Sequence, residues 1–230
     1  MNGLPVTATA SISPAAARAF SASSVAAYSM SVAAPSVFGQ AIVLPLLSQL
    51  LEVHPELRVD LDLSDRVVDI VGQGLDLALR VATLDDSELV AKRLASNPRI
   101  ICAAPRYLQR HGQPATLAAL DEHQCVVLHA LPRWPLVIDG HLQRRRVNAR
   151  VITSSVEAAR TATVQGLGLA MLCYWDVHEH LAAGSLVAIE LADVSMEDLS
   201  VWAVTPTRRY VPTRVKIFVE ALENALRRIE

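Results

Sequence analysis

Strand-like and helix-like segments alternate over residues 28–82, and this alternation is the feature that most constrains the fold. Some segments are apolar or alternate between apolar and polar residues, and those between them space their apolar residues as helices do. Strands joined through helices form parallel sheets with right-handed crossovers. We therefore expect an α/β fold. The expected strands are 28–34, 57–63 and 75–82, and the expected helices are 41–53 and 66–74.

The same alternation continues in a second block of the chain. We expect the chain to enter this block near Ser96 and Asn97 and to leave it near Leu199, after which a last strand and a closing helix over 212–230 return to the first block. Two lobes joined by two extended crossing strands form a cleft with a hinge. The predicted division is lobe I over 29–96 and 200–230, and lobe II over 97–199.

The composition supports a sizeable core and excludes several classes of protein. Hydrophobic residues make up 52% of the chain and charged residues 19%, with a net charge of -2. A DNA-binding domain usually has a basic patch, and these totals do not indicate one. No apolar run reaches the roughly 18 residues of a membrane span. We therefore expect a cytoplasmic protein without a membrane partner.

The first 28 residues differ from the rest in being rich in alanine and serine, with Arg18 as their only charged residue. They lack the basic start and apolar middle of a secretory signal. We interpret them as a poorly ordered leader, with a transit peptide as the alternative.

The end of the first strand places a serine where a helix follows. Ser36 comes directly after Pro35 and is followed by Val37, Phe38 and Gly39. The hydroxyl of Ser36 and the N–H groups of the next three residues could bind a ligand carboxylate at the helix N-terminus. An ordinary helix cap is the alternative for Ser36. Phe38 could line a binding site or staple the helix start, and Gly39 would let the backbone approach a ligand.

Two further pairs of residues are candidates for ligand contact. Ser64 and Asp65 repeat the arrangement at the expected start of the second helix, where a cap or an ion pair of Asp65 with a nearby arginine is the alternative. Arg133 and Trp134 lie in an expected loop between prolines, where the indole could stack on an apolar or aromatic ligand or form a lid without ligand contact.

Other residues point away from catalysis and metal binding. The seven histidines, His178 and His180 included, show no metal-like grouping, and no nucleophile motif or acid–base pair supports an enzyme. We expect no cofactor. Three widely spaced cysteines indicate reduced core thiols rather than a redox sensor. The run Arg144 to Arg146 favours a solvated strand edge over an anion or DNA patch.

Four stretches of the chain resemble the effector-binding domain of LysR-type transcriptional regulators, which shares the fold of type 2 periplasmic solute-binding proteins. They are SVAAPSVFGQAIVLPLLSQLLEVHPELRVDLDLSDRVVDIVGQGLDLALRVA, LVAKRLASNPRIICAAPRYLQRHGQP, SSVEAARTATVQGLGLAMLC and PTRRYVPTRVKIFVEAL, spanning about residues 29–228. Their order and spacing make the resemblance specific.

The resemblance implies a small-molecule sensor with two Rossmann-like lobes, not an enzyme. It implies that Ser154 and Ser155, at the start of a helix, face Ser36 from the other lobe. It also implies a homodimer or tetramer that binds DNA through a winged helix-turn-helix head. We expect that head to be absent, because 28 residues are fewer than the roughly 45 that three helices need. A solute-binding protein of a transport system is the alternative function, since it has the same fold.

Overall fold

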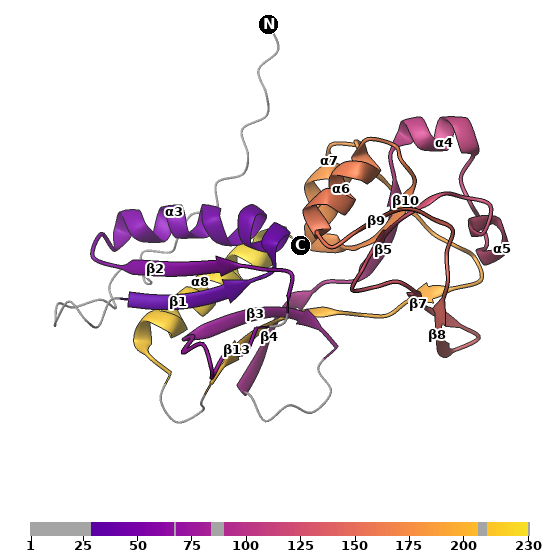
Figure 1. Cartoon of the computed structure of the whole chain (residues 1–230). Coiled ribbons are helices and arrows are strands. Elements are labelled where there is room, and N and C mark those ends of the chain that lie inside the picture. The colour runs from indigo at the N-terminus through magenta and orange to yellow at the C-terminus, as the bar shows by residue number, and fades with distance from the viewer. Residues whose placement is uncertain (1–28, 67, 84–89, 207–210, 230) are drawn as a thin grey trace, which may run out of the picture. The chain divides into compact units, whose positions relative to one another are not determined.

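The computed structural model describes residues 29–229, except 67, 84–89 and 207–210 (Figure 1). The chain divides into two compact units. Unit 1 holds the described residues up to Arg80, those within Leu84–Ala95 and those from Val201 onwards, whereas unit 2 holds Val81–Thr83 and Ser96–Ser200. Each unit combines β-sheet with helices, so the expected α/β class is confirmed. The leader expected over residues 1–28 lies outside the described residues.

Unit 1 is built on a five-stranded sheet in the order β2-β1-β3-β13-β4. The second strand in this order, β1, runs parallel to both of its neighbours, β2 and β3. This is the parallel pairing that the alternation of strands and helices predicts. The strands are β1 Ser29–Ala34, β2 Arg58–Leu63, β3 Leu77–Ala82, β4 Val90–Ser96 and β13 Ser200–Thr205.

The helix after β1 begins at Ser36, five residues earlier than the sequence pattern indicates. It comprises α2 (Ser36–Phe38), the π-helical turn η2 (Gly39–Val43) and α3 (Leu44–Val53). Pro45 lacks an N–H group and crowds the preceding turn, and a wider π-helical turn accommodates both effects. The whole stretch Ser36–Val53 is long and apolar enough to cross a membrane by length and composition, although its inner face is buried.

The apolar spacing of α3 places Leu44, Leu47, Leu50 and Leu51 on one broad face, but these residues are not buried alike. Leu46, Leu47 and Leu50 are buried, whereas Leu44 is 46% exposed and Leu51 38% exposed. The inner face is therefore centred on Leu46, Leu47 and Leu50, and Leu44 and Leu51 lie outside it.

The helix expected over 66–74 is not formed by the described residues of this segment. A single turn replaces it, in which the Asp69 carboxylate accepts hydrogen bonds from the N–H groups of Val71 (3.2 Å) and Gly72 (3.0 Å). The turn closes at Gly74, whose φ is +66°. Two glycines within three residues favour a turn over a helix, and Asp69 rather than Ser64 caps it.

The C-terminal helix α8 (Thr213–Ile229) buries the face that its apolar spacing predicts. Val215, Phe218, Leu222 and Leu226 are fully buried. The helix contacts α3 and η2 within unit 1. Arg214, near its start, forms an ion pair with Asp76 (3.1 Å), which precedes β3.

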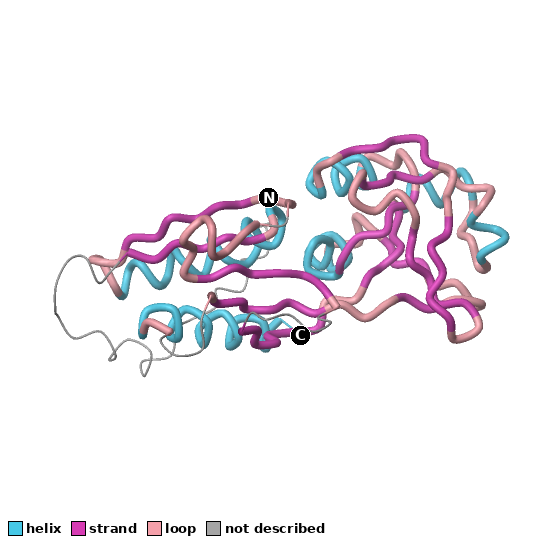
Figure 2. The backbone as a smooth tube through the Cα atoms, turned by 60° about the horizontal axis from the view of Figure 1, so that its bottom comes forward, coloured by secondary structure: helices cyan, strands magenta, loops and turns pink. Residues whose placement is uncertain are grey.

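Unit 2 has a five-stranded sheet in the order β11-β5-β10-β6-β9 and a three-stranded sheet in the order β12-β7-β8. Figure 2 colours the strands magenta and the helices cyan. In the larger sheet β6 is parallel to β10 and β9, whereas β5 is antiparallel to β10 and β11. The strands of the larger sheet are β5 Arg99–Ala103, β6 Cys125–Leu128, β9 Ala149–Thr153, β10 Leu169–Cys173 and β11 Val187–Ile189. The smaller sheet has β7 Trp134–Ile138, β8 His141–Arg145 and β12 Ser195–Met196.

The helices of unit 2 are α4, α5, α6 and α7. Two of them, α6 and α7, pack against the larger sheet and share a core with it. Their bounds are α4 Pro105–His111, α5 Leu117–Leu120, α6 Val156–Val164 and α7 Tyr174–Ala182.

Two glycines carry the chain from α6 into β10. Gly166, with a φ of +66°, donates to the Thr163 carbonyl while Leu167 donates to the Ala162 carbonyl, which is the Schellman ending of a helix. At Gly168, an added Cβ would lie 2.5 Å from the Gln124 carbonyl oxygen. These two glycines therefore end the helix and turn the chain into the strand.

A buried polar cluster lies under α4. The Tyr107 hydroxyl accepts a hydrogen bond from the Gln124 N–H (3.0 Å) and lies 3.3 Å from Nδ1 of His123, which is buried. Burial lowers the pKa of His123, and neighbouring His111 lowers it further. His123 is therefore held in its neutral form within unit 2.

We expect Gly168→Ala to destabilise the protein, because the new methyl group would overlap the Gln124 carbonyl and the backbone would have to move. The expected loss in the free energy of unfolding is about 3 kcal/mol, measured by urea denaturation. Gly184→Ala is the control, since Gly184 has a positive φ but open space around it. It should cost about 1 kcal/mol from backbone strain alone, and an equal loss in both variants would contradict the overlap.

Acidification should destabilise unit 2 through His123. Its folded-state pKa lies below the ordinary value of 6.5, so the unfolded chain takes up the proton first as pH falls. Stability is thus complete above pH 6.5 and falls as pH drops from there towards the folded pKa. His54 and His180 also have lowered pKa values, so the wild type must be compared with His123→Gln. Between pH 7.5 and 5.5 the melting temperature of the wild type should fall further than that of His123→Gln. Equal falls in the two proteins would refute the assignment of this pH dependence to His123.

Candidate functional site

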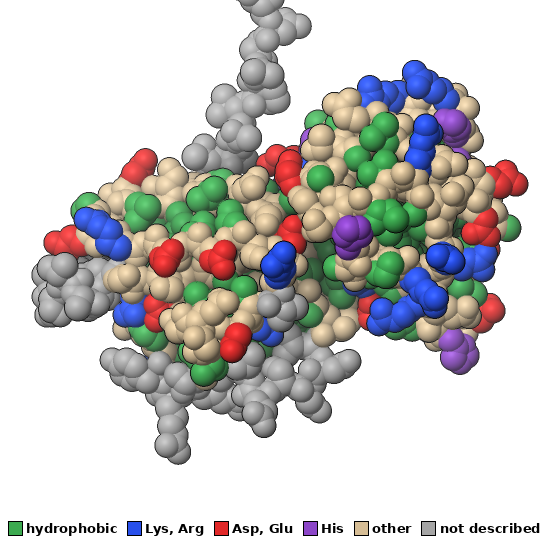
Figure 3. Space-filling view, in the orientation of Figure 1, with side chains coloured by type: hydrophobic (Ala, Val, Ile, Leu, Met, Phe, Trp, Pro, Cys, Tyr) green, Lys and Arg blue, Asp and Glu red, His purple; other side chains and the backbone are tan. Residues whose placement is uncertain are grey.

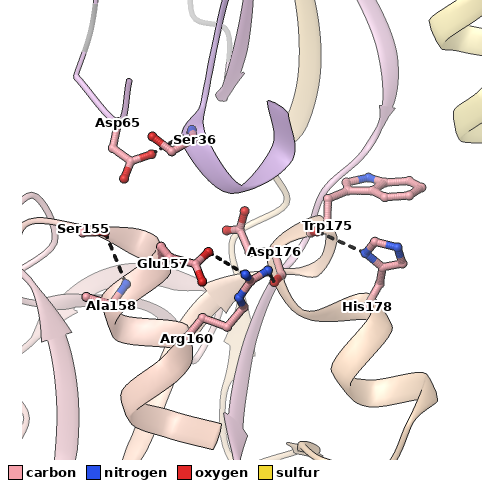
Figure 4. A network of polar contacts seen from close by, with 9 residues as sticks. All are labelled: Ser36, Asp65, Ser155, Glu157, Ala158, Arg160, Trp175, Asp176 and His178. Carbon is pink, nitrogen blue, oxygen red and sulfur yellow. Dashed lines mark hydrogen bonds and ion pairs between the residues drawn. The ribbon is translucent and has the colours of Figure 1, made fainter. Parts of the chain in front are cut away.

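The carboxyl ends of β1 and β2 meet at one edge of the unit 1 sheet. The two strands pair in parallel with Ala34 opposite Leu63, so the residues that follow them lie side by side. The Ser36 N–H donates to Oδ1 of Asp65 across a distance of 3.0 Å (Figure 4). Pro35 occupies the cap position and Ser36 is the first helical residue, so the alternative of Ser36 as the helix cap is wrong.

The next residues of this helix start are buried. Val37 and Phe38 are each 1% exposed, and their N–H groups belong to the first turn, which has no intrahelical carbonyl to accept them. An added Cβ on Gly39 would lie 2.2 Å from a methyl group of Leu63. The close approach that requires a glycine is therefore one between the helix and the end of β2.

Ser64 fixes the chain as it leaves β2. Its N–H donates to the Ala34 carbonyl (3.0 Å), and its hydroxyl oxygen accepts from the Arg66 N–H (3.2 Å). The hydroxyl thus closes a local turn instead of capping a helix. Ser36, Ser64 and Asp65 are nevertheless brought together at this edge, which we call edge 1.

An equivalent edge forms in unit 2 at the carboxyl end of β9. The Ser155 hydroxyl caps α6 by accepting from the Ala158 N–H (3.2 Å), while Ser154 is exposed (Figure 4). His129 follows the parallel strand β6, and its N–H donates to the Thr153 carbonyl (2.8 Å). We call Ser154, Ser155 and His129 edge 2. The sequence pattern did not single out His129, which only the pairing of β6 with β9 places there.

Arg133 and Trp134, predicted together as ligand contacts, lie in different environments. Trp134 opens strand β7, is 1% exposed and packs in the main core of unit 2, so its expected place in a loop is wrong. Arg133 is exposed. Asp139 and Gly140 form a two-residue turn that joins β7 to β8, and both have positive φ.

The arginine run follows the outer strand of this hairpin. Arg144 and Arg146 are exposed, and Arg145 forms an ion pair with Asp121 (2.5 Å). Exposed arginines on a terminal strand agree with the interpretation of a solvated edge.

Sequence reasoning also missed an arginine that links α6 to α7. Arg160 forms an ion pair with Glu157 on its own helix and donates to the Asp176 backbone carbonyl (3.3 Å) on α7 (Figure 4). A spacing of three residues predicts the first contact. The second depends on how the two helices pack, and nothing in the local sequence signals it.

Within the part of the chain that the structure describes, no group of three or more histidine, cysteine or acidic residues could hold a metal ion. His178 and His180 are engaged separately, with the Trp175 carbonyl and the Ser185 hydroxyl. Burial raises the pKa of Cys102 and Cys125 to about 12. These thiols stay protonated, which fits the expected core role and not redox sensing.

The relatives of this chain are transcriptional regulators. The transcriptional regulator DmlR of Escherichia coli K12 is 32% identical over 81% of this chain and 62% of its own length. The transcriptional activator TtdR of the same strain is 30% identical over 80% of this chain and 60% of its own. The chain thus spans about three fifths of the length of these relatives.

A solved structure and a family model agree with these relatives. CrgA, a LysR-type transcriptional regulator from Neisseria meningitidis, superposes with a TM-score of 0.76 and 26% identity, over 86% of this chain and 68% of its own. The LysR substrate binding domain matches residues 25–227, which is most of the sequence. The two-unit α/β fold is therefore that of the type 2 periplasmic-binding-protein class, and the chain belongs to the LysR family through its substrate-binding domain.

Proposed function

We propose that this chain senses a small organic acid at edge 1 and edge 2. The observation that carries the proposal is the convergence of Ser36, Ser64 and the first turn of a long helix at the carboxyl ends of two parallel strands. Open α/β sheets bind their ligands at such edges. Edge 2 offers a second set of hydroxyl groups at the start of another helix.

The proposed ligand chemistry follows from the donors at edge 1. The Ser36 hydroxyl is only partly buried and lies at the positive end of the helix, so it favours a carboxylate. The N–H groups of Val37 and Phe38 add to this positive end, although both residues are buried. The structure does not support stacking of an aromatic ligand on Phe38 or Trp134, because both side chains are buried. Asp65 puts a negative charge beside the same N-terminus, so we propose a monoanionic ligand over a dianionic one. Arg133 remains a candidate contact.

The sensing would serve transcription. The relatives are named as helix-turn-helix regulators, and we propose that effector binding to this domain controls such a regulator in the cytoplasm. A solute-binding protein of a transport system, with the same fold, is not supported by these relatives.

We further propose that two copies of the chain associate through α3. Its exposed apolar stripe consists of Leu44 and Leu51, which are seven residues apart on one face of the helix and are 46% and 38% exposed. Figure 3 shows hydrophobic side chains on the surface of unit 1. Beside it in unit 1, β2 is an outer strand of the sheet, with Asp60 and Asp62 exposed. Charges on an outer strand discourage strand-to-strand pairing, so a partner would contact the helix stripe. LysR-type regulators oligomerise, and a second copy is the occupant that we propose for this stripe.

Ser36→Ala should weaken binding of an organic acid at least about tenfold, because a hydrogen bond to a charged group is lost. The acid would be identified by a thermal-shift screen of mono- and dicarboxylic acids, and its affinity measured by calorimetry. Asp65→Asn should instead tighten binding about twofold to fivefold, since it removes a negative charge from the helix N-terminus.

Asp62→Asn serves as the matched control for this pair of variants, since Asp62 lies exposed on the neighbouring strand. It should leave the affinity unchanged. Binding that is indifferent to both Ser36→Ala and Asp65→Asn would place the ligand elsewhere and refute the assignment of edge 1.

Leu44→Asp combined with Leu51→Asp should convert the dimer to a monomer at micromolar concentration, because buried aspartates would oppose association of the stripe. Light scattering gives the mass of each species. Leu142→Asp is the control, since Leu142 is 50% exposed but lies on β8 in unit 2. A wild-type monomer, or a double variant that stays dimeric, would contradict the proposal.

A further inference from the structure

Asn97 lies at the point where the chain passes into unit 2. The outgoing segment is Ser96–Pro98, and the returning segment reaches unit 1 after Ser200. Asn97 is 1% exposed, and its backbone N–H donates to the Leu199 carbonyl (2.8 Å). This hydrogen bond ties the two crossing segments together.

The outgoing segment also holds the start of α7. The Trp175 N–H donates to Oδ1 of Asn97 (3.1 Å), and the Trp175 indole N–H donates to the Ser96 carbonyl (2.8 Å). The Tyr174 N–H donates to the Pro98 carbonyl (2.9 Å). First-turn N–H groups need acceptors from outside their helix, and here the crossing segment supplies them. Trp175, which Figure 4 shows at the start of this helix, is 1% exposed.

The amide nitrogen of the Asn97 side chain, unlike its oxygen, takes no part in these hydrogen bonds. This Nδ2 atom is buried and has no hydrogen-bond partner among the described residues. A buried donor without an acceptor destabilises the arrangement that contains it. Aspartate would accept the same hydrogen bond from Trp175 and suits a helix N-terminus, but it would bring a negative charge to a position that is 1% exposed. Asparagine therefore differs from aspartate at this position in its two amide protons and in its neutrality.

We propose that Asn97 is the positioning residue that couples effector binding to the crossing segments. In the arrangement described here its amide protons lack an acceptor, and in a second arrangement of the crossing segments they gain one. Effector binding selects the second arrangement, so the unsatisfied donor biases the protein toward response. The coupling to effector binding rests on the proposed sensing function. The existence of two arrangements of the crossing segments does not depend on that function.

A second tie between the same segments provides a control. Arg99, just after Asn97, forms an ion pair with Glu197 (2.5 Å), just before Leu199. Glu197→Gln loosens the crossing segments without touching the Asn97 amide. Asn148→Asp repeats the charge change of Asn97→Asp at an exposed position of unit 2.

The first measurement needs no ligand. Hydrogen–deuterium exchange of the full chain should be severalfold slower at the Asn97 and Trp175 N–H groups in Asn97→Asp, because the variant keeps the acceptor and removes the unsatisfied donors. Asn97→Leu, which removes the acceptor as well, should exchange faster at Trp175, and Asn148→Asp should match the wild type. Unchanged or faster exchange in Asn97→Asp would overturn the proposal.

The second measurement uses the organic acid that gives the largest thermal shift with the wild type. Asn97→Asp should weaken its binding at least about fivefold by calorimetry, which is the lower end of typical coupling between sites. Glu197→Gln and Asn148→Asp should bind it within about twofold of the wild type. Unchanged affinity in Asn97→Asp would overturn the coupling, whereas failure of every acid to bind the wild type would refute the proposed function and leave the exchange result to decide on Asn97.

Discussion

Parallel pairing of β1 with β2 is the constraint on which edge 1 depends. Two parallel strands start at the same side of the sheet and end at the same side, so whatever follows each strand is brought to a common edge. The register, with Ala34 opposite Leu63, sets Ser36 and Asp65 close enough for a hydrogen bond of 3.0 Å. The pairing of β6 with β9 does the same for His129 and Ser154 in unit 2. Candidate binding residues distant in sequence are therefore neighbours because of backbone geometry alone.

The lack of acceptors in a first helical turn shapes both units. At edge 1, Asp65 takes the N–H of the first helical residue, while those of Val37 and Phe38 have no carbonyl within the helix. At the start of α7 the Ser96–Pro98 segment takes this role instead. The first solution leaves the partly exposed Ser36 hydroxyl at a sheet edge, beside the buried Val37 and Phe38. The second buries the helix start against the crossing chain, which suits a structural joint better than a binding site.

Periodicity predicted most elements of the fold, since the α8 face and the strands around both sheets follow simple apolar spacing. It failed where local hydrogen bonds decided the start or the existence of a helix. The helix after β1 begins five residues earlier than the pattern indicates, and a single turn at Asp69 replaces an expected helix. Trp134 illustrates a different limit. Flanking prolines indicated a loop, but β12 pairs only with Leu136 and Val137 of β7, so Pro135 lies where one side of the strand is unpaired. A strand tolerates proline at such a place, and the Trp134 indole fills the core.

The candidate site was predictable only in part. Its serines can either close a local turn or contact a ligand, and local sequence does not distinguish these two roles. Ser64 and Ser155 both close local hydrogen bonds as acceptors, which would suffice to explain their presence. A serine hydroxyl that accepts one bond still has its own proton to donate. Capping a turn and binding a ligand carboxylate therefore use different parts of the same group, and they are compatible. Asn97 could not have been found in this way, since its importance comes from contacts to Trp175 and Leu199, 78 and 102 residues further along the chain. Packing decides which distant groups hydrogen-bond to Asn97. Only the structure shows that its side-chain oxygen has a partner and its side-chain nitrogen does not.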